Sequence, residues 1–176
     1  MKETELKIRI LGDPALTKTV NPVKEVNDFH RKILSQMARL MYSVSGIGLA
    51  ATQVGLQESM IVVDAGSGLY KLLNPRIVKK QGEQKSEEGC LSVPGVCVQI
   101  KRAKSVVIEA IDENGKAQKI DAEGLLACVF QHELDHLNGK LIVDYLSKEK
   151  KANVKKKISG APGSLPQAEF REGIEF

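Results

Sequence analysis

The sequence lacks long apolar segments. No stretch of the 176 residues reaches the roughly 18 uninterrupted apolar residues that a membrane-spanning helix requires. Residues 1–5 carry no apolar run of the kind found in secretory signals. We therefore expect a cytoplasmic protein, with neither a membrane nor DNA as a partner.

Cysteine is scarce, and glycine and proline are not enriched. The three cysteines, Cys90, Cys97 and Cys128, are an odd number, which argues against a disulfide framework and favours metal or catalytic use. Glycine occurs 15 times and proline 6 times, too rarely for a fibrous or disordered chain. With 42% hydrophobic and 27% charged residues, the chain is predicted to form a compact domain.

Charge of one sign is concentrated in one segment. The net charge is only +4, but residues 148–157 hold six lysines against Glu149, a local charge of +5. The rest of the chain is therefore near neutral. A solvated lysine-rich helix is the ordinary interpretation, and contact with ribosomal RNA is the functional alternative.

Apolar spacing predicts the main elements. Spacings of three and four predict a helix over 25–41, and a helix over 122–137 is expected with Asp121 as its N-cap and Asn138-Gly139 as its stop. Short apolar or alternating runs predict extended segments at 60–64, 70–73 ending at Asn74-Pro75, 96–100, 105–111 and 141–145. Further signals are a glycine-rich loop at 45–48, a hairpin turn at Asn114-Gly115, and Ser147 capping the lysine-rich helix.

These elements predict an α+β fold, with antiparallel sheets around a central helix and one further helix toward each terminus. We expect a catalytic domain at 1–147. Residues 148–176 are expected to form the lysine-rich helix and, from 160–164 onward, a mobile tail, within the same domain or as an appendage.

The central helix carries an H-E-x-x-H motif. His132 and His136 are four residues apart, which places both imidazoles on one helix face, with Glu133 beside them. This is the arrangement of two metal ligands and a general base. Two histidines packed on a helix face without a metal are the ordinary alternative.

A catalytic metal site needs a third protein ligand and one open position. Cys128 cannot join both histidines, because the helix rises about 12 Å from Cys128 to His136, far beyond metal–ligand bond lengths. Cys97 is better explained as packing within a strand, and His30 as a structural residue of the first helix. Cys90, in a turn-rich segment, is the best candidate.

Three segments together resemble the peptide deformylase family. They are GIGLAATQ at 46–53, EGCLS at 88–92 and QHELDH at 131–136, in matching order and separation. The resemblance runs from about Gly12 to Ser147. It implies an enzyme that removes formate from the N-terminal formyl-methionine of newly made polypeptides.

The resemblance also implies residue roles. Cys90, His132 and His136 would bind one divalent metal, usually Fe²⁺ and replaceable by Zn²⁺, Ni²⁺ or Co²⁺. Metal-bound water would be the nucleophile and Glu133 the general acid/base. The Gln53 side chain and the Leu91 N–H would stabilise the oxyanion.

Substrate contacts follow the same motifs. The resemblance implies that Gly48 hydrogen-bonds the substrate backbone. A set of small and apolar side chains near the motifs could enclose methionine, namely Ile47, Leu125, Cys128 and Val129. Asp135 could orient a ligand histidine and Arg102 could pair with Glu88, but a solvated or structural role is at least as common for each, and neither is assigned to the site.

Two other functions share part of this pattern. A zinc endopeptidase also uses H-E-x-x-H, but such enzymes take a third ligand downstream, and no histidine follows His136. A structural metal module would have a closed fourth ligand and no need for Glu133 or Gln53. Metal stoichiometry and activity on formyl-Met-Ala would separate the three.

Overall fold

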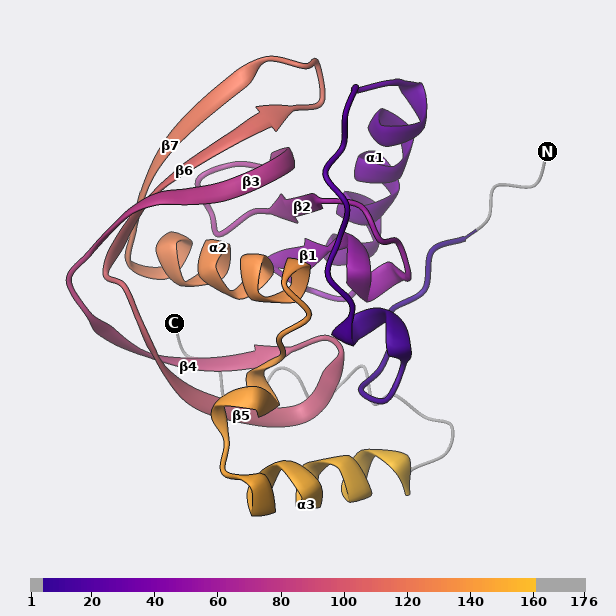
Figure 1. Ribbon diagram of the computed structural model, residues 1–176, viewed down its shortest axis with the longest axis vertical. Helices are drawn as coiled ribbons and strands as arrows, with labels where there is room; N and C mark the ends of the chain where they lie inside the picture. The colour runs from indigo at the N-terminus through magenta and orange to yellow at the C-terminus, as the bar shows by residue number, and fades with distance from the viewer. Residues whose placement is uncertain (1–4, 161–176) are drawn as a thin grey trace.

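The computed structural model describes residues 5–160 and confirms the predicted α+β fold (Figure 1). A five-stranded antiparallel sheet has the order β1-β2-β3-β6-β7, and β4 and β5 form a separate two-stranded sheet. The strands are β1 (Gly48–Ala50), β2 (Met60–Val63), β3 (Tyr70–Gln81), β4 (Gln84–Cys90), β5 (Val93–Arg102), β6 (Ser105–Asp112) and β7 (Ala117–Glu123). The helices are α1 (Asp28–Ser43), α2 (Gly124–Leu137) and α3 (Lys148–Ser159), with short 3-10 turns η1 (Pro14–Thr17), η2 (Ala51–Val54) and η3 (Ile142–Tyr145).

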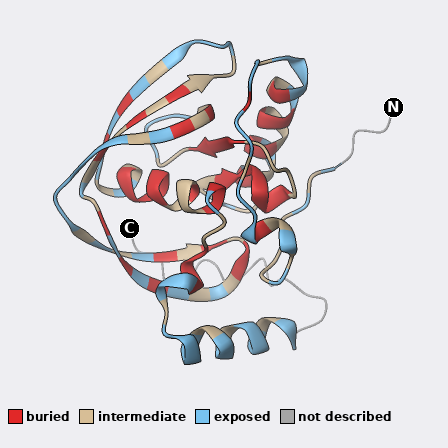
Figure 2. Ribbon diagram, in the orientation of Figure 1, coloured by how far each residue is buried: buried red, intermediate tan, exposed pale blue. Residues whose placement is uncertain are grey.

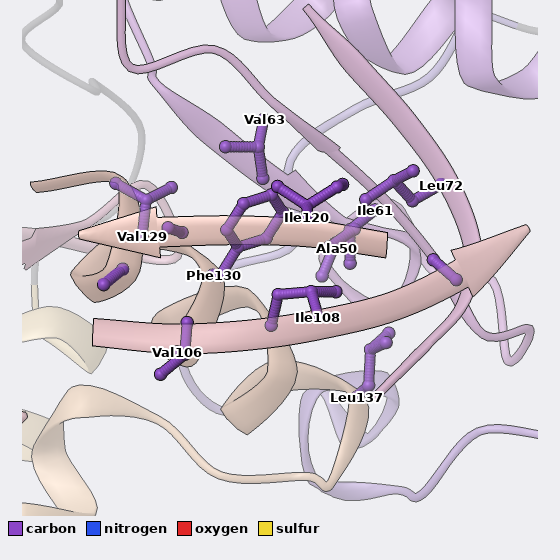
Figure 3. Close-up of a cluster of buried hydrophobic side chains, with 13 residues drawn as sticks. Ala50, Ile61, Val63, Leu72, Val106, Ile108, Ile120, Val129, Phe130 and Leu137 are labelled. Atoms are coloured by element: carbon purple, nitrogen blue, oxygen red, sulfur yellow. The ribbon is translucent and has the colours of Figure 1, made fainter. Parts of the chain in front are cut away.

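Helix α2 contacts both sheets and forms the centre of the molecule. Phe130 points from α2 into a cluster with Ile108 and Ile120 of the larger sheet (Figure 3). Figure 2 shows that α2 is mostly buried, whereas α3 is mostly exposed. Among the described residues, no helix is long and apolar enough to cross a membrane.

Helix α1 begins later than its apolar spacing predicted. Asn27 and His30 form a capping box, in which the Asn27 side chain accepts from the His30 N–H and His30 Nδ1 accepts from the Asn27 N–H. Two of the free N–H groups at the helix start are satisfied in this way. His30 is thus a buried structural residue, as predicted.

The prediction that a strand ends at Asn74-Pro75 is wrong. Strand β3 continues to Gln81, with a register shift between Leu73 and Arg76. Asn74 adopts a positive φ of 51°, and its side-chain amide bonds both the N–H and the carbonyl of Val23. The irregular residue therefore anchors a neighbouring segment while the strand resumes beyond it.

The predicted start of the central helix is also wrong. Asp121 is not its N-cap, because Ile120 and Ala122 are buried in β7 while Asp121 and Glu123 are exposed, the period-two pattern of a strand. Helix α2 starts at Gly124. Its predicted end holds: Gly139 has a φ of 72°, and a Cβ atom there would lie 2.6 Å from the Thr17 carbonyl oxygen.

The C-terminal elements follow the predictions in part. The segment predicted as extended over 141–145 contains the 3-10 turn η3 instead. Ser147 does cap α3, accepting from the Lys150 N–H. Val154 and Ile158 pack α3 against the cluster formed with β5 and η3. The predicted mobile tail lies outside the described residues from 161 onward.

Candidate metal centre

The i, i+4 spacing on α2 brings the two histidines of the motif together. Their Nε2 atoms are 3.1 Å apart, and the rings meet edge to face. Burial and the neighbouring His132 lower the pKa of His136 well below its usual value. Although burial opposes it, hydrogen bonds to Cys90 and Glu88 raise the pKa of His132. The two imidazoles of this buried pair therefore differ in their preference for a proton.

Cys90 completes a cluster of three ligand atoms. It ends β4, and its Sγ lies 3.3 Å from Nε2 of His136. The ligand atoms of Cys90, His132 and His136 all lie within 4.8 Å of one another. A tetrahedral ion with bonds of roughly 2.0 to 2.3 Å separates its ligand atoms by about 3.3 to 3.7 Å, so the three side chains fit one metal ion.

A buried carboxylate orients His132. Glu88 Oε2 lies 2.9 Å from Nδ1 of His132, the ring nitrogen that faces away from the cluster. Arg102 holds Glu88 through bonds of 2.7 and 2.8 Å to its two oxygens. Burial opposes ionisation of Glu88, but the bonds to Arg102 and His132 outweigh it and lower the pKa to about 2. A carboxylate on the outer nitrogen fixes the ring and its tautomer.

The same arginine extends the network to η3. Arg102 Nη1 bonds Asp135 Oδ2 at 2.7 Å and Tyr145 Oη at 3.0 Å, and Tyr145 donates to Asp135 at 2.7 Å. The pairing of Arg102 with Glu88 that the sequence suggested is thereby confirmed, and the arginine is buried. Asp135 supports Arg102 rather than a histidine. The sequence held one sign that Arg102 is buried. Alternate side chains of a strand face the same side, and Arg102 follows Val98 and Ile100 on the buried face of β5.

Glu133 is buried beside the ligands. Its Oε2 is a buried oxygen without a hydrogen-bond partner among the described residues, and burial raises its pKa to about 7. The backbone of Gly48 lies against its Oε1. An unpartnered carboxylate oxygen is free to accept a proton from a bound molecule.

Gln53 faces the cluster from η2. Its Oε1 accepts from the Ala50 N–H, which turns Nε2 toward Ser92 Oγ at 3.2 Å and Cys90 Sγ at 3.7 Å. Leu91 lies in the turn between β4 and β5, directly after Cys90. Sequence motifs 46–53 and 88–92 therefore meet at one place.

The apolar candidates lie on neighbouring elements. Val129 is buried with Phe130, and Ile47 packs against the same cluster. Leu125 precedes Val129 by one helical turn and is 36% exposed. Cys128 is buried, and burial raises the pKa of its thiol. Their role in binding methionine stays a prediction.

One cysteine prediction is wrong. Cys97 does not pack in the core, because it lies on the exposed face of β5. Its neighbours Val98 and Ile100 occupy the buried face. Cys97 therefore takes no part in the core or in the cluster of Cys90 and the two histidines.

Comparison with known proteins identifies the family. The family described as polypeptide deformylase matches residues 5–152. The chain belongs to the polypeptide deformylase family. It is 45% identical over 152 residues to the peptide deformylase of Thermoanaerobacter pseudethanolicus, covering 84% of this chain and 96% of that relative.

Solved deformylase structures share the fold. The peptide deformylase from Legionella pneumophila matches with a TM-score of 0.84 at 39% identity, covering 89% of this chain and 95% of that one. The enzyme from Ehrlichia chaffeensis in complex with actinonin matches with a TM-score of 0.88 at 34% identity, covering 92% and 99%. The resemblance inferred from three motifs is thereby confirmed, as is membership in a metallohydrolase family.

Proposed function

We propose that this chain removes the formyl group from the N-terminal formyl-methionine of newly synthesised polypeptides and releases formate. The observation that carries the proposal is the cluster of Cys90, His132 and His136 together with the buried, unpartnered carboxylate oxygen of Glu133, the residue that follows His132, in a chain of the deformylase family. The reaction is hydrolysis of a linear amide.

Cys90, His132 and His136 would hold the metal, which we propose is Fe²⁺, with Zn²⁺, Ni²⁺ or Co²⁺ able to substitute. When bound, a divalent metal supplies a Lewis acid for the attacking water and the formyl oxygen. A thiolate with two imidazoles suits each of these ions. Glu88 and Arg102 keep the His132 ring in the orientation that binding requires.

Glu133 would act as the general acid/base. Its free Oε2 accepts a proton from the attacking water and returns it to the nitrogen of the leaving amine. Because the carboxyl is buried, its raised pKa of about 7 makes it a stronger base than an ordinary glutamate. Gly48 gives this carboxylate room and would bond the substrate backbone.

Gln53 and Leu91 would stabilise the oxyanion. The Gln53 amide is held by the Ala50 N–H and directed at Cys90, and the Leu91 N–H follows that cysteine in the chain. Donors placed for the developing charge lower the barrier by about 3 to 4 kcal/mol each. Ile47, Leu125, Cys128 and Val129 would enclose the methionine side chain.

The competing endopeptidase function predicts a different product. We propose to incubate the metal-loaded protein with formyl-Met-Ala-Ser and follow products by mass spectrometry. Loss of formate with both peptide bonds intact is expected, and cleavage between residues would contradict the proposal. Because the Ehrlichia relative is a complex with actinonin, we also expect actinonin to raise the melting temperature of this protein.

We further propose that the protein acts in the cytoplasm, where α3 contacts ribosomal RNA. Its lysines are exposed, apart from partly buried Lys151, which pairs with Asp144. Neutralising Lys155, Lys156 and Lys157 to glutamine should weaken cosedimentation with ribosomes and flatten its salt dependence, without changing activity on a short formyl peptide. Equal ribosome binding by the wild-type protein and the triple-glutamine variant would show that α3 has no part in that binding.

The division of the chain into a catalytic domain and a C-terminal part at residue 147 stays a prediction.

A further inference from the structure

Residues 9–11, ahead of η1, bond both loops that carry the proposed oxyanion donors. The indigo segment before η1 reaches the turn that joins β4 to β5 (Figure 1). The Arg9 N–H donates to the Gln53 carbonyl at 2.7 Å, and the Leu11 N–H donates to the Ser92 carbonyl at 2.8 Å. Neighbouring residues of one short segment thus hold both loops.

The spacing of these donors limits the spacing of the loops. Only Ile10 separates Arg9 from Leu11, and two residues of chain span at most about 7 Å. Gln53 carries one proposed donor on its side chain, and Ser92 directly follows the other, the Leu91 N–H. A bond of 3.2 Å from Gln53 Nε2 to Ser92 Oγ joins the loops a second time.

The segment is itself anchored on both sides. Ile8 packs against the cluster formed by α1, β1 and β2, whereas Leu11 packs against the cluster that contains Cys90 and η3. The Arg9 side chain lies over Gly55, the C-cap of η2, and pairs with Asp13 at 3.6 Å. The segment therefore contacts the hydrophobic clusters of both sheets, next to the site.

We propose that residues 9–11 form a main-chain clamp that positions Gln53 and Leu91 relative to each other for the oxyanion. This inference rests on the proposed function. The clamp residues are positioning residues, because their N–H groups reach the loop carbonyls and not the reacting atoms. Displacing an oxyanion donor should therefore lower kcat and leave the metal ligands in place.

Proline substitution tests the clamp because proline has no N–H. Relative to Arg9→Ala, which keeps the donor, Arg9→Pro should lower kcat on formyl-Met-Ala by about 10- to 100-fold, with KM changed less and one metal per chain retained. Lys7→Pro places a proline in the same segment, where the residue's N–H bonds neither loop among the described residues, and it controls for the ring itself. Equal kcat for Arg9→Pro and Arg9→Ala would overturn the clamp.

A double mutant separates positioning from general damage. If the Arg9 N–H acts through Gln53, Arg9→Pro should have little further effect in a Gln53→Ala background. A full effect in that background would overturn the clamp. If wild-type protein releases no formate, the proposed function fails instead, and the clamp is judged by structure alone.

Amide exchange provides that structural readout in zinc-loaded wild-type protein. The Arg9 and Leu11 amides should exchange with solvent at least 100-fold more slowly than an unprotected amide. Free exchange at either position would overturn the clamp, whatever the activity. This measurement also decides the case if Arg9→Pro fails to fold.

Discussion

Gly48 lies directly against the carboxylate of Glu133. A Cβ atom at position 48 would fall 2.2 Å from Oε1 and 2.8 Å from Cδ of Glu133. Contacts this short are excluded, so any other residue at the start of β1 would move the strand or the carboxylate. The glycine-rich motif thus supplies room for the proposed base as well as backbone for the substrate.

Gly48→Ala should displace Glu133 and lower kcat/KM by about 100-fold, a typical share for a general base. The metal ligands lie elsewhere, so metal content should stay at one ion per chain. Steady-state kinetics and elemental analysis would check both quantities. A Gly48→Ala variant with wild-type kcat/KM would contradict this account.

Mutations of the proposed base and of the proposed ligands should affect metal content differently. Glu133→Ala should abolish turnover but retain the metal, because the carboxylate is not one of the three ligand side chains. Cys90→Ala or His132→Ala should lose metal and activity together. Near-normal turnover of metal-loaded Glu133→Ala would show that another group moves the proton.

Arg102 should be far more important for stability than an exposed arginine. Arg102→Met removes both hydrogen bonds that the arginine donates to the buried Glu88 carboxylate, leaving only its bond to His132, and should reduce the free energy of unfolding by roughly 3 to 5 kcal/mol. The matched control is Arg76→Met, whose pair with Glu109 is exposed and should contribute about 1 kcal/mol or less. Denaturant titrations at equal metal loading would compare them. Equal small losses would contradict the role of the network.

Methionine should be preferred at the substrate N-terminus. Ile47, Cys128 and Val129 are apolar and partly or fully buried, and each methylene missing from a fitted side chain is worth roughly 1 to 3 kcal/mol. The specificity constant for formyl-Met-Ala should therefore exceed that for formyl-Ala-Ala by at least about 10-fold. Equal constants would rule out an apolar methionine pocket.

Local sequence signals predicted much of the fold and the residues of the metal cluster. The i, i+4 histidines and the glycine stop of α2 depend on nearby residues, so they were visible in the sequence. The helix start was misplaced because Asp121 is also a good cap, and only pairing of β7 with β6 selects the strand. Local strand signals likewise could not show that β3 resumes after Asn74, which depends on a distant bond to Val23.

Long-range polar pairing was predicted only in part: the pair of Arg102 with Glu88 was considered, but not the burial of the arginine or its bond to Asp135. Arg102 meets Glu88 across 14 positions and Asp135 across 33, so no local pattern reports these bonds. Its place on the buried face of β5 was the one available signal. The clamp at Arg9 and Leu11 uses main-chain groups, which any residue except proline provides, and therefore leaves no mark in side-chain motifs.

The most direct test of the account is an anaerobic metal titration of the apo protein with formate release as the readout. Oxygen is excluded because cysteine side chains and ferrous iron can oxidise in air. We expect no turnover without metal, a linear rise with added Fe²⁺ that ends at one ion per chain, and no response in Cys90→Ala. Formate release by metal-free protein, or a rise that continues to two ions per chain, would contradict a single Cys90-His132-His136 centre as the catalytic site.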